Sequence, residues 1–337
     1  MPTWSEIATE LDAVFRQRNV PPFDIVRRKY LSSLYALTGR NCILYATNWT
    51  QPGKDPNAIS INEEDIQGLM EVIHGLHGRD LDLILHSPGG SPEAAAAIVS
   101  YLRSKFDDIR VIIPHTAMSA ATMISCASNK IVMGRHSFIG PIDPQFIMQT
   151  PLGIMSVPAQ AILDQFEMAK AQCKDPQILG AWLPILNQYG PALLIQSQNA
   201  IELSRKYASE WLTQFMFAAE TDRDRAKKKA DDIADRLSNH ALFKSHSHHI
   251  SCEEARRIGL IVEELEANQD LQDLVLSIYH ATTHTFNGTP AVKIIENQNG
   301  KAYIRVQAMP AQIVQQQLPP QQQPPQPPHQ APKPPAP

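Results

Sequence analysis

Short apolar runs alternate with helix-forming segments between residues 41 and 134, and this alternation constrains the fold more than any other feature. The runs at 41–47, 81–85, 111–113 and 130–134 are short enough for buried strands. The segments between them have helical lengths and patterns. Strands that alternate with helices at this spacing predict a parallel sheet with right-handed crossovers. We therefore expect an α/β fold.

The flanking segments predict four parts in the chain. The pattern from Thr3 to Gly39 is helical and is broken at Pro21 and Pro22, which predicts an N-terminal helical arm over 1–40. The central domain should cover 41–285, and after about Thr150 its pattern turns helical, with a scaffold or oligomerisation helix pair within 195–237. Apolar alternation predicts a C-terminal hairpin over 286–308. Residues 309–337, nearly all Pro and Gln, should form a disordered tail.

Composition and charge exclude several classes of function. The 337 residues carry a formal net charge of −4 without a long basic run, so we expect no nucleic-acid partner. The four cysteines show no paired short spacing, which argues against a zinc knuckle or a dense disulfide framework and favours a reducing compartment. The first predicted helix carries acidic residues among its apolar ones, so it does not have the continuous apolar core of a cleavable signal peptide. No apolar stretch of the sequence is long enough to span a membrane as a helix. We expect a soluble, cytoplasmic protein; membrane attachment through the first helix is left open but not predicted.

Two polar motifs follow predicted strands, where ligand sites in parallel sheets lie. Ser87, Pro88, Gly89 and Gly90 turn from a buried strand into a helix, and their amides could donate to an oxyanion. Alone, such a turn is often only a turn. Ser119 starts the next helix, where the amide of Ala120 could supply a second donor.

An isolated serine at this position would usually be a helix N-cap, so the joint arrangement matters more than either motif alone. One helix and one strand fit the interval between Gly89 and Ser119, and this places the two loops side by side. The pair predicts a site for acyl-bond hydrolysis.

The motifs LDLILHSPGGSPEAA, VIIPHTAMSAATMISCASNKIVM and IGPIDPQF resemble the serine dehydrogenase proteinase family. That family is related to the signal peptide peptidases and, more distantly, to Clp protease and the crotonases. The resemblance covers roughly Cys42 to Leu265, including SHSHHISCEEARRIGLIVEEL. It implies a Clp-protease/crotonase-like parallel sheet with helical layers, between the N-terminal helical arm and the disordered C-terminal tail.

The resemblance also implies the roles of a serine peptidase. Ser119 would be the nucleophile, Gly89, Gly90 and Ala120 the oxyanion hole, and Asp143 and His246 the partners that activate the serine. The related signal peptide peptidases use a lysine base, for which Lys170 is the alternative, and His248 is a second alternative base. The substrate would be a polypeptide, and the superfamily generally forms homo-oligomeric rings.

Other interpretations of these residues remain open. Asp143 could cap a turn, and Lys170 could be a solvated helix lysine. His86 and His115, at two strand ends, are expected to border the cleft without transferring protons. His246, His248 and His249 form a cluster, but no carboxylate or cysteine lies around them at a recognised metal-ligand spacing. We therefore expect neither a metal nor a cofactor.

The chain departs from the family at Ala120 and Ala121, where relatives usually have two glycines. Alanine keeps the amide donors but narrows the space near the nucleophile. A catalytically silent scaffold that recruits partners through the Pro/Gln tail is therefore the competing hypothesis. A crotonase-like acyl-CoA enzyme ranks below it, because no acidic pair is evident near the cleft.

Overall fold

The central sheet of the protein is mostly parallel, as the sequence predicts. We describe it from a computed structural model that covers residues 2–150 and 153–307. Within these residues the sheet has seven strands in the order β10-β5-β3-β2-β1-β11-β12. The strands are β1 (Asn41–Thr47), β2 (Asp80–His86), β3 (Asp108–Ile113), β5 (Lys130–Met133), β10 (Val262–Glu264), β11 (Ala291–Asn297) and β12 (Ala302–Val306). The first five are parallel, and β11 and β12 extend the sheet as an antiparallel hairpin.

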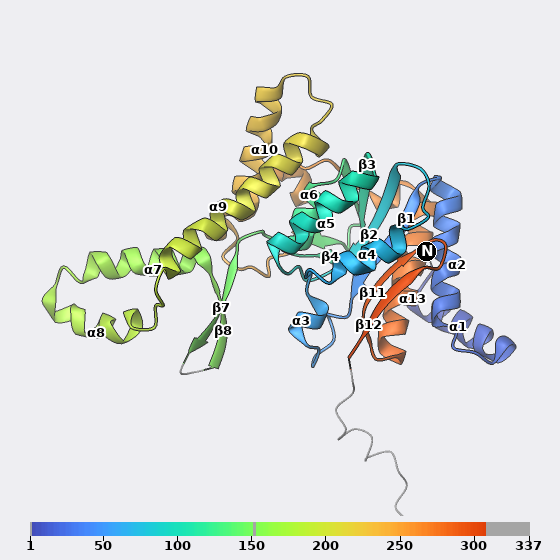
Figure 1. Ribbon diagram of the computed structural model, residues 1–337, viewed down its shortest axis with the longest axis horizontal. Helices are drawn as coiled ribbons and strands as arrows, with labels where there is room; N and C mark the ends of the chain where they lie inside the picture. The colour runs from blue at the N-terminus through green and yellow to red at the C-terminus, as the bar shows by residue number, and fades with distance from the viewer. Residues whose placement is uncertain (1, 151–152, 308–337) are drawn as a thin grey trace, which may run out of the picture. The chain divides into compact units, whose positions relative to one another are not determined.

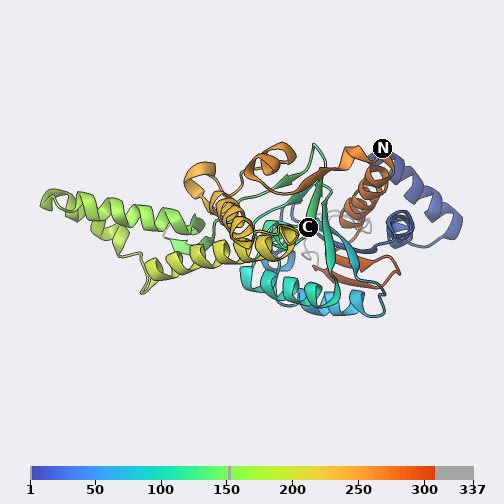
Figure 2. The ribbon, with the colours of Figure 1, turned by 90° about the horizontal axis from the view of Figure 1, so that it is seen from above.

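Helices cover both faces of this sheet, because alternate side chains of each buried strand point to opposite faces. Leu83 and Leu85 of β2 face one apolar cluster, while Ile84 faces the other. The first face is covered by α4 (Asp65–Ile73), α5 (Pro92–Lys105) and α6 (Ala120–Cys126), and the second by α2 (Phe23–Thr38) and α13 (Gln269–Gly288). Figure 2 shows these two helical layers on opposite sides of the sheet.

The N-terminal helices pack onto the second layer. The predicted break falls between α1 (Trp4–Arg18) and α2, and Asn19 ends α1 in the left-handed conformation. Ile7 and Leu11 of α1 are buried with Val26 and Ala281. The helices of the predicted arm and the predicted hairpin belong to the same compact unit as the sheet, Met1–Gln307. The predicted disordered tail, 309–337, lies outside the described residues.

Two small sheets lie beside the central one. The first joins β4 (Thr116–Ala117), β6 (Phe138–Ile139) and β9 (Ile250–Ser251). The second pairs β7 (Gln145–Thr150) with β8 (Gly153–Pro158). The expectation of helix from about Thr150 is therefore wrong for the residues up to Pro158, because β8 pairs with β7 before the next helix begins.

The remaining helices lie around these sheets and between their strands along the chain (Figure 1). Helix α9 (Leu193–Trp211) packs against both α7 (Ala159–Gln172) and α10 (Arg223–Ser238), so the predicted helix pair is present. None of the helices in the described part of the chain is long and apolar enough to span a membrane. The bounds are α3 (Pro56–Ile59), α7 (Ala159–Gln172), α8 (Pro176–Leu186), α9 (Leu193–Trp211), the π-helix η1 (Leu212–Met216), α10 (Arg223–Ser238), α11 (His240–Phe243), α12 (Cys252–Ile258) and the 3-10 helix η2 (Leu265–Ala267).

A buried ion pair joins strand β11 to the start of α4. Lys293 Nζ lies 2.6 Å from Asp65 Oδ1, and both side chains are almost fully buried. The same Nζ donates to the Ser60 carbonyl, while the Tyr45 hydroxyl and the Asn62 amide donate to Asp65 Oδ2. Burial lowers the pKa of Lys293, and the Asp65 carboxylate opposes this shift. The pair therefore holds residues 60–62 in place through charge-assisted hydrogen bonds.

Lys293→Met is expected to lower the free energy of unfolding by about 3–5 kcal/mol, because it leaves the Asp65 charge buried without its cation. Chemical denaturation measures the change. Lys228→Met, on the exposed surface of α10, is the control and should stay within about 0.5 kcal/mol of the wild type. Equal effects of the two substitutions would contradict the role of the ion pair.

Candidate active site

The loops that follow β2 and β3 are hydrogen-bonded to each other. The Ser87 amide donates to the Thr116 carbonyl at 3.1 Å, and the Met118 amide donates to the Ser87 carbonyl at 2.9 Å. Ser87 and Ala117 thus form an isolated parallel bridge beyond the ends of the strands. The double-glycine loop and the loop before α6 therefore run side by side.

Gly89 packs directly against the turn that carries Ser119. Its φ is +96°, a conformation that side chains rarely adopt. A Cβ atom on Gly89 would lie 2.6 Å from the Met118 carbonyl oxygen and 2.7 Å from Ser119 Cβ. Glycine is therefore required here by both conformation and space.

Ser119 occupies a strained turn between β4 and α6. Its φ of 51° and ψ of −119° lie outside the regions that non-glycine residues commonly adopt. Such strain clusters at functional sites, and a serine on a sharp strand-to-helix turn is typical of hydrolase nucleophiles. Ser119 stands at the N-cap position, yet its side chain makes no capping hydrogen bond. Ser119 therefore does not cap α6 through its side chain.

The amides near Ser119 differ in what they already bind. Ala120 is the first residue of α6, so its amide has no acceptor within the helix. The Gly89 amide donates to Ser87 Oγ at 3.2 Å. Ile61 binds the carbonyl of Gly89 and the amide of Ser91. In this bridge the amide of Gly90 points away from Ile61.

Asp143 is buried and accepts hydrogen bonds from two histidines. His246 Nδ1 lies 2.7 Å from Oδ1, and His240 Nδ1 lies 2.9 Å from Oδ2. Gln145 Nε2 also donates to Oδ2, at 3.0 Å. The predicted pair of Asp143 and His246 is thus in contact. His240 and Gln145 were not predicted, although His240 precedes His246 by only six positions in the same segment.

A cavity of about 480 Å³ brings Ser119 and His246 to one site. Gly89, Gly90 and Ala120 also line it, whereas Ala121 is buried in the core. Among the described residues Ser119 Oγ makes no hydrogen bond with His246, and catalytic hydrogen bonds are often long in the absence of substrate. Most other lining residues are apolar or small, including Pro88, Met123, Ile142, Phe146, Ile147 and Ala200.

The two alternative bases do not line this cavity. Lys170 is exposed on α7, where its Nζ lies 2.9 Å from Glu167 Oε1. His248 Nε2 lies 3.5 Å from Glu254 Oε1, and its ring packs near Phe243. Neither side chain is therefore in a position to take a proton from Ser119 in this structure.

His86 and His115 do not border the cavity, contrary to expectation. His86 has the same orientation along β2 as Ile84, so it faces the α13 layer, where it contacts Tyr279. His115 Nδ1 lies 3.1 Å from the Tyr279 hydroxyl. Burial lowers the pKa of His86 to about 3, with a smaller effect from His115, so this imidazole is neutral near pH 7.

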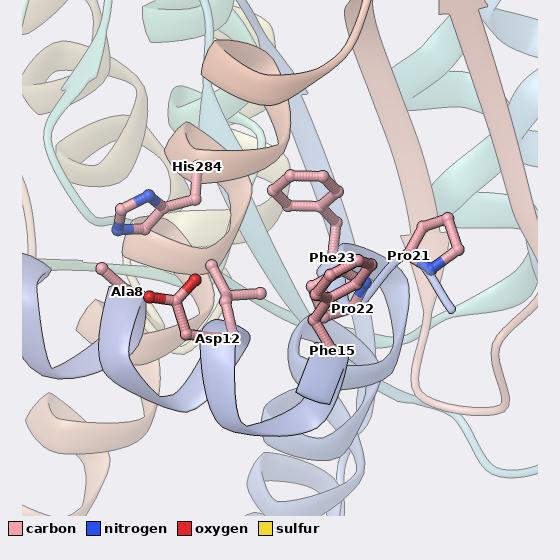
Figure 3. Close-up of a pocket in the computed structure, with 8 residues that line it drawn as sticks. Ala8, Asp12, Phe15, Pro21, Pro22, Phe23 and His284 are labelled. Carbon is pink, nitrogen blue, oxygen red and sulfur yellow. The ribbon is translucent and has the colours of Figure 1, made fainter. Parts of the chain in front are cut away.

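A second cavity, of about 420 Å³, lies between α1, α2 and α13 (Figure 3). Phe15, Phe23 and the prolines of the interhelical turn form most of its apolar wall, with Asp12 at one side. The ring of His284 stacks on Trp4 at 3.9 Å, and its Nε2 bonds to the Trp4 carbonyl. Among the residues that the structure describes, the lining of this cavity includes no serine or cysteine.

A comparison with family models agrees with this geometry. The model of the ClpP-like SDH-type serine proteinases matches residues 60–182. This stretch contains the double-glycine loop, Ser119 and Asp143, whereas His240 and His246 follow it. Residues 60–182 are thus similar to the ClpP-like SDH-type serine proteinases. The predicted resemblance and the ClpP-like α/β fold are confirmed.

Two uncharacterised proteins of Methanocaldococcus jannaschii are similar to the chain. One is 31% identical over 206 residues, which cover 60% of this chain and 60% of the relative. The other is 24% identical over 237 residues, which cover 70% of this chain and 68% of the relative. The chain thus spans about two thirds of these proteins or less.

Among solved structures, a mutant of a membrane-bound stomatin-specific protease is similar over 54% of this chain and 63% of its own. Its sequence is 16% identical, and the TM-score is 0.29.

Gly89→Ala is expected to destabilise the fold by about 1–3 kcal/mol more than Gly75→Ala, because its methyl group would collide with the Ser119 turn. Gly75 is a matched control: its φ is +83°, and nothing lies within 4 Å of a Cβ placed there. Thermal and chemical unfolding measure both variants. Equal losses would show that the two loops are not in close contact.

Proposed function

We propose that the chain is a serine peptidase that hydrolyses peptide bonds through an acyl-enzyme on Ser119. The observation that carries this proposal is the strained turn of Ser119 against the double-glycine loop, in a cavity that His246 also lines. The family match supports the same reaction class. In this proposal Ser119 is the nucleophile, His246 the general base and Asp143 the residue that orients the base.

The hydrogen bonds of Asp143 fix the form of the histidine. An ionised carboxylate only accepts, so His246 donates its Nδ1 proton and keeps Nε2 as the acceptor. Nε2 would take the Ser119 hydroxyl proton as Oγ forms a bond to the carbonyl carbon. The same proton would then pass to the leaving amine as the peptide bond breaks. His246 would then take a proton from a water molecule as that water attacks the carbonyl carbon of the acyl-enzyme, and Ser119 would leave with the proton returned to its Oγ.

The oxyanion of each tetrahedral intermediate would be held by main-chain amides. We assign Ala120 and Gly90 as the donors, because the Gly89 amide is already bonded to Ser87 Oγ. Gly89 contributes by its lack of a side chain, which lets the loop approach Ser119. Alanine at 120 and 121 is compatible with this arrangement, since the Ala120 amide is retained and Ala121 lies in the core.

The substrate would be an extended polypeptide. The cavity is bordered by the edge of the β7-β8 hairpin, through Gln145, Phe146 and Ser156, and main-chain pairing with this edge would orient the chain. Apolar lining residues such as Met123 and Ile142 would contact substrate side chains. Peptide recognition of this kind needs no cofactor.

Ser119→Ala is expected to abolish covalent labelling by a fluorophosphonate probe, because the probe phosphonylates only an activated serine. Gel fluorescence and mass spectrometry of the labelled peptide measure the reaction. Ser104→Ala, on the α5 helix, is the control and should label like the wild type. Wild-type protein that fails to label, or a Ser119→Ala variant that still labels, would contradict the proposal.

We further propose that the protein assembles as a homo-oligomer through the α7–α9 region. Five apolar side chains on these three helices are between 37% and 63% exposed, and their burial would favour association. They are Met168, Ile178, Leu179, Leu183 and Ile195. A second copy of the chain would bury them.

The double variant Leu179→Glu/Leu183→Glu is expected to reduce the molar mass in solution toward that of one 37.5 kDa chain, because both charges would enter the contact. The two positions lie four residues apart, on one side of α8. Light scattering after gel filtration measures the mass. Val20→Glu, at an exposed apolar position before α2, is the control. A monomeric wild type, or an unchanged mass in the double variant, would contradict this assembly.

A further inference from the structure

We propose that His240 is a positioning residue for the catalytic apparatus: it fixes the Asp143 carboxylate so that Asp143 can orient His246. This inference rests on the proposed peptidase function. It assigns His240 a role through Asp143 and no contact with the substrate.

The carboxylate of Asp143 is held at both oxygens. Oδ1 accepts from His246 Nδ1 at 2.7 Å, and Oδ2 accepts from His240 Nδ1 at 2.9 Å. Gln145 Nε2 is the other donor to Oδ2, at 3.0 Å. Donors on both oxygens oppose rotation of the carboxylate about its Cβ–Cγ bond. The Oδ1 atom that binds His246 is thereby kept in one direction.

Burial makes the second donor matter. The Asp143 side chain is 3% exposed, so water cannot readily replace a lost hydrogen bond at Oδ2. Without His240, Gln145 would be the remaining donor to this oxygen among the described residues, and Gln145 itself lines the substrate cavity. The carboxylate would then be free to turn toward other donors, and His246 would lose its fixed orientation.

The local fold holds His240 rigidly. His240 is the first residue of the short helix α11, and the Asn239 side chain caps this helix by accepting from the Leu242 amide at 3.1 Å. Phe243, at the other end of α11, is buried in the main core. The segment therefore places the two histidines, six positions apart, on the two oxygens of one carboxylate.

His240 and His246 border different cavities. His246 lines the cavity that contains Ser119. His240 lines a separate cavity with Arg205 and Asp235, which form an ion pair with each other. His240 thus has access to Asp143 but not to the substrate cavity. Its loss should reduce the rate of the chemical step and leave substrate binding unchanged.

The test compares His240→Asn with His240→Gln in the full-length protein. The asparagine amide nitrogen can occupy the place of Nδ1 and donate to Asp143, whereas the glutamine amide reaches one carbon further. Peptide hydrolysis should show a kcat near that of the wild type for His240→Asn and a kcat about 100-fold lower for His240→Gln, with KM unchanged in both. His240→Ala should resemble His240→Gln.

His249→Ala is the matched control, since His249 is an exposed histidine of the same segment that stacks on Phe138 and does not contact Asp143. Equal kcat values for His240→Asn and His240→Gln would overturn the inference, as would a loss of activity that appears only in KM. The comparison of the His240 variants requires that the wild type hydrolyse the peptide and that Ser119→Ala not do so. Failure of that dependence would overturn the peptidase proposal instead, so the two failures are distinguishable.

Discussion

The close packing of Gly89 against the Ser119 turn is the contact on which the rest of the site depends. Parallel strands β2 and β3 end at the same edge of the sheet, and the bridge between Ser87 and Ala117 continues their pairing into the loops. A residue with any side chain at position 89 would separate these loops. Because the contact is made mostly of backbone atoms, it holds the main chain close to the serine with little freedom to move.

Buried residues of the core hold the double-glycine loop in place through hydrogen bonds. The backbone of Ile61 is hydrogen-bonded to the residues on either side of Gly90. The carbonyl of the preceding residue, Ser60, accepts a hydrogen bond from the buried Lys293. A chain of hydrogen bonds therefore runs from strand β11 to the double-glycine loop. On the other side of the cavity Asp143 joins the segment after β6 to the late histidine segment. Hydrogen bonds to elements distant in sequence thus hold the residues on both sides of the cavity.

The sequence predicts the sheet and the close approach of the two loops well, because both depend on local patterns. Apolar runs define the strands, and the positions of Gly89 and Ser119 after two of them follow from the topology of parallel sheets. Contacts between residues far apart in the sequence could not be predicted from local patterns. The hydrogen bond between His240 and Asp143 spans 97 positions, and the antiparallel pairing of β7 with β8 interrupts a helical pattern. His86 was expected at the cleft because it ends a strand, but the two-residue period of β2 turns it to the opposite face.

The central claim is that main-chain amides at 90 and 120 stabilise an oxyanion formed on Ser119. A crystal structure of the protein after reaction with a fluorophosphonate tests this most directly, since the phosphonyl oxygen stands in for the oxyanion. The account predicts a covalent bond to Ser119 Oγ, with that oxygen about 2.7–3.1 Å from the amide nitrogens of Gly90 and Ala120. A phosphonyl oxygen that points into solvent, away from both amides, would contradict it.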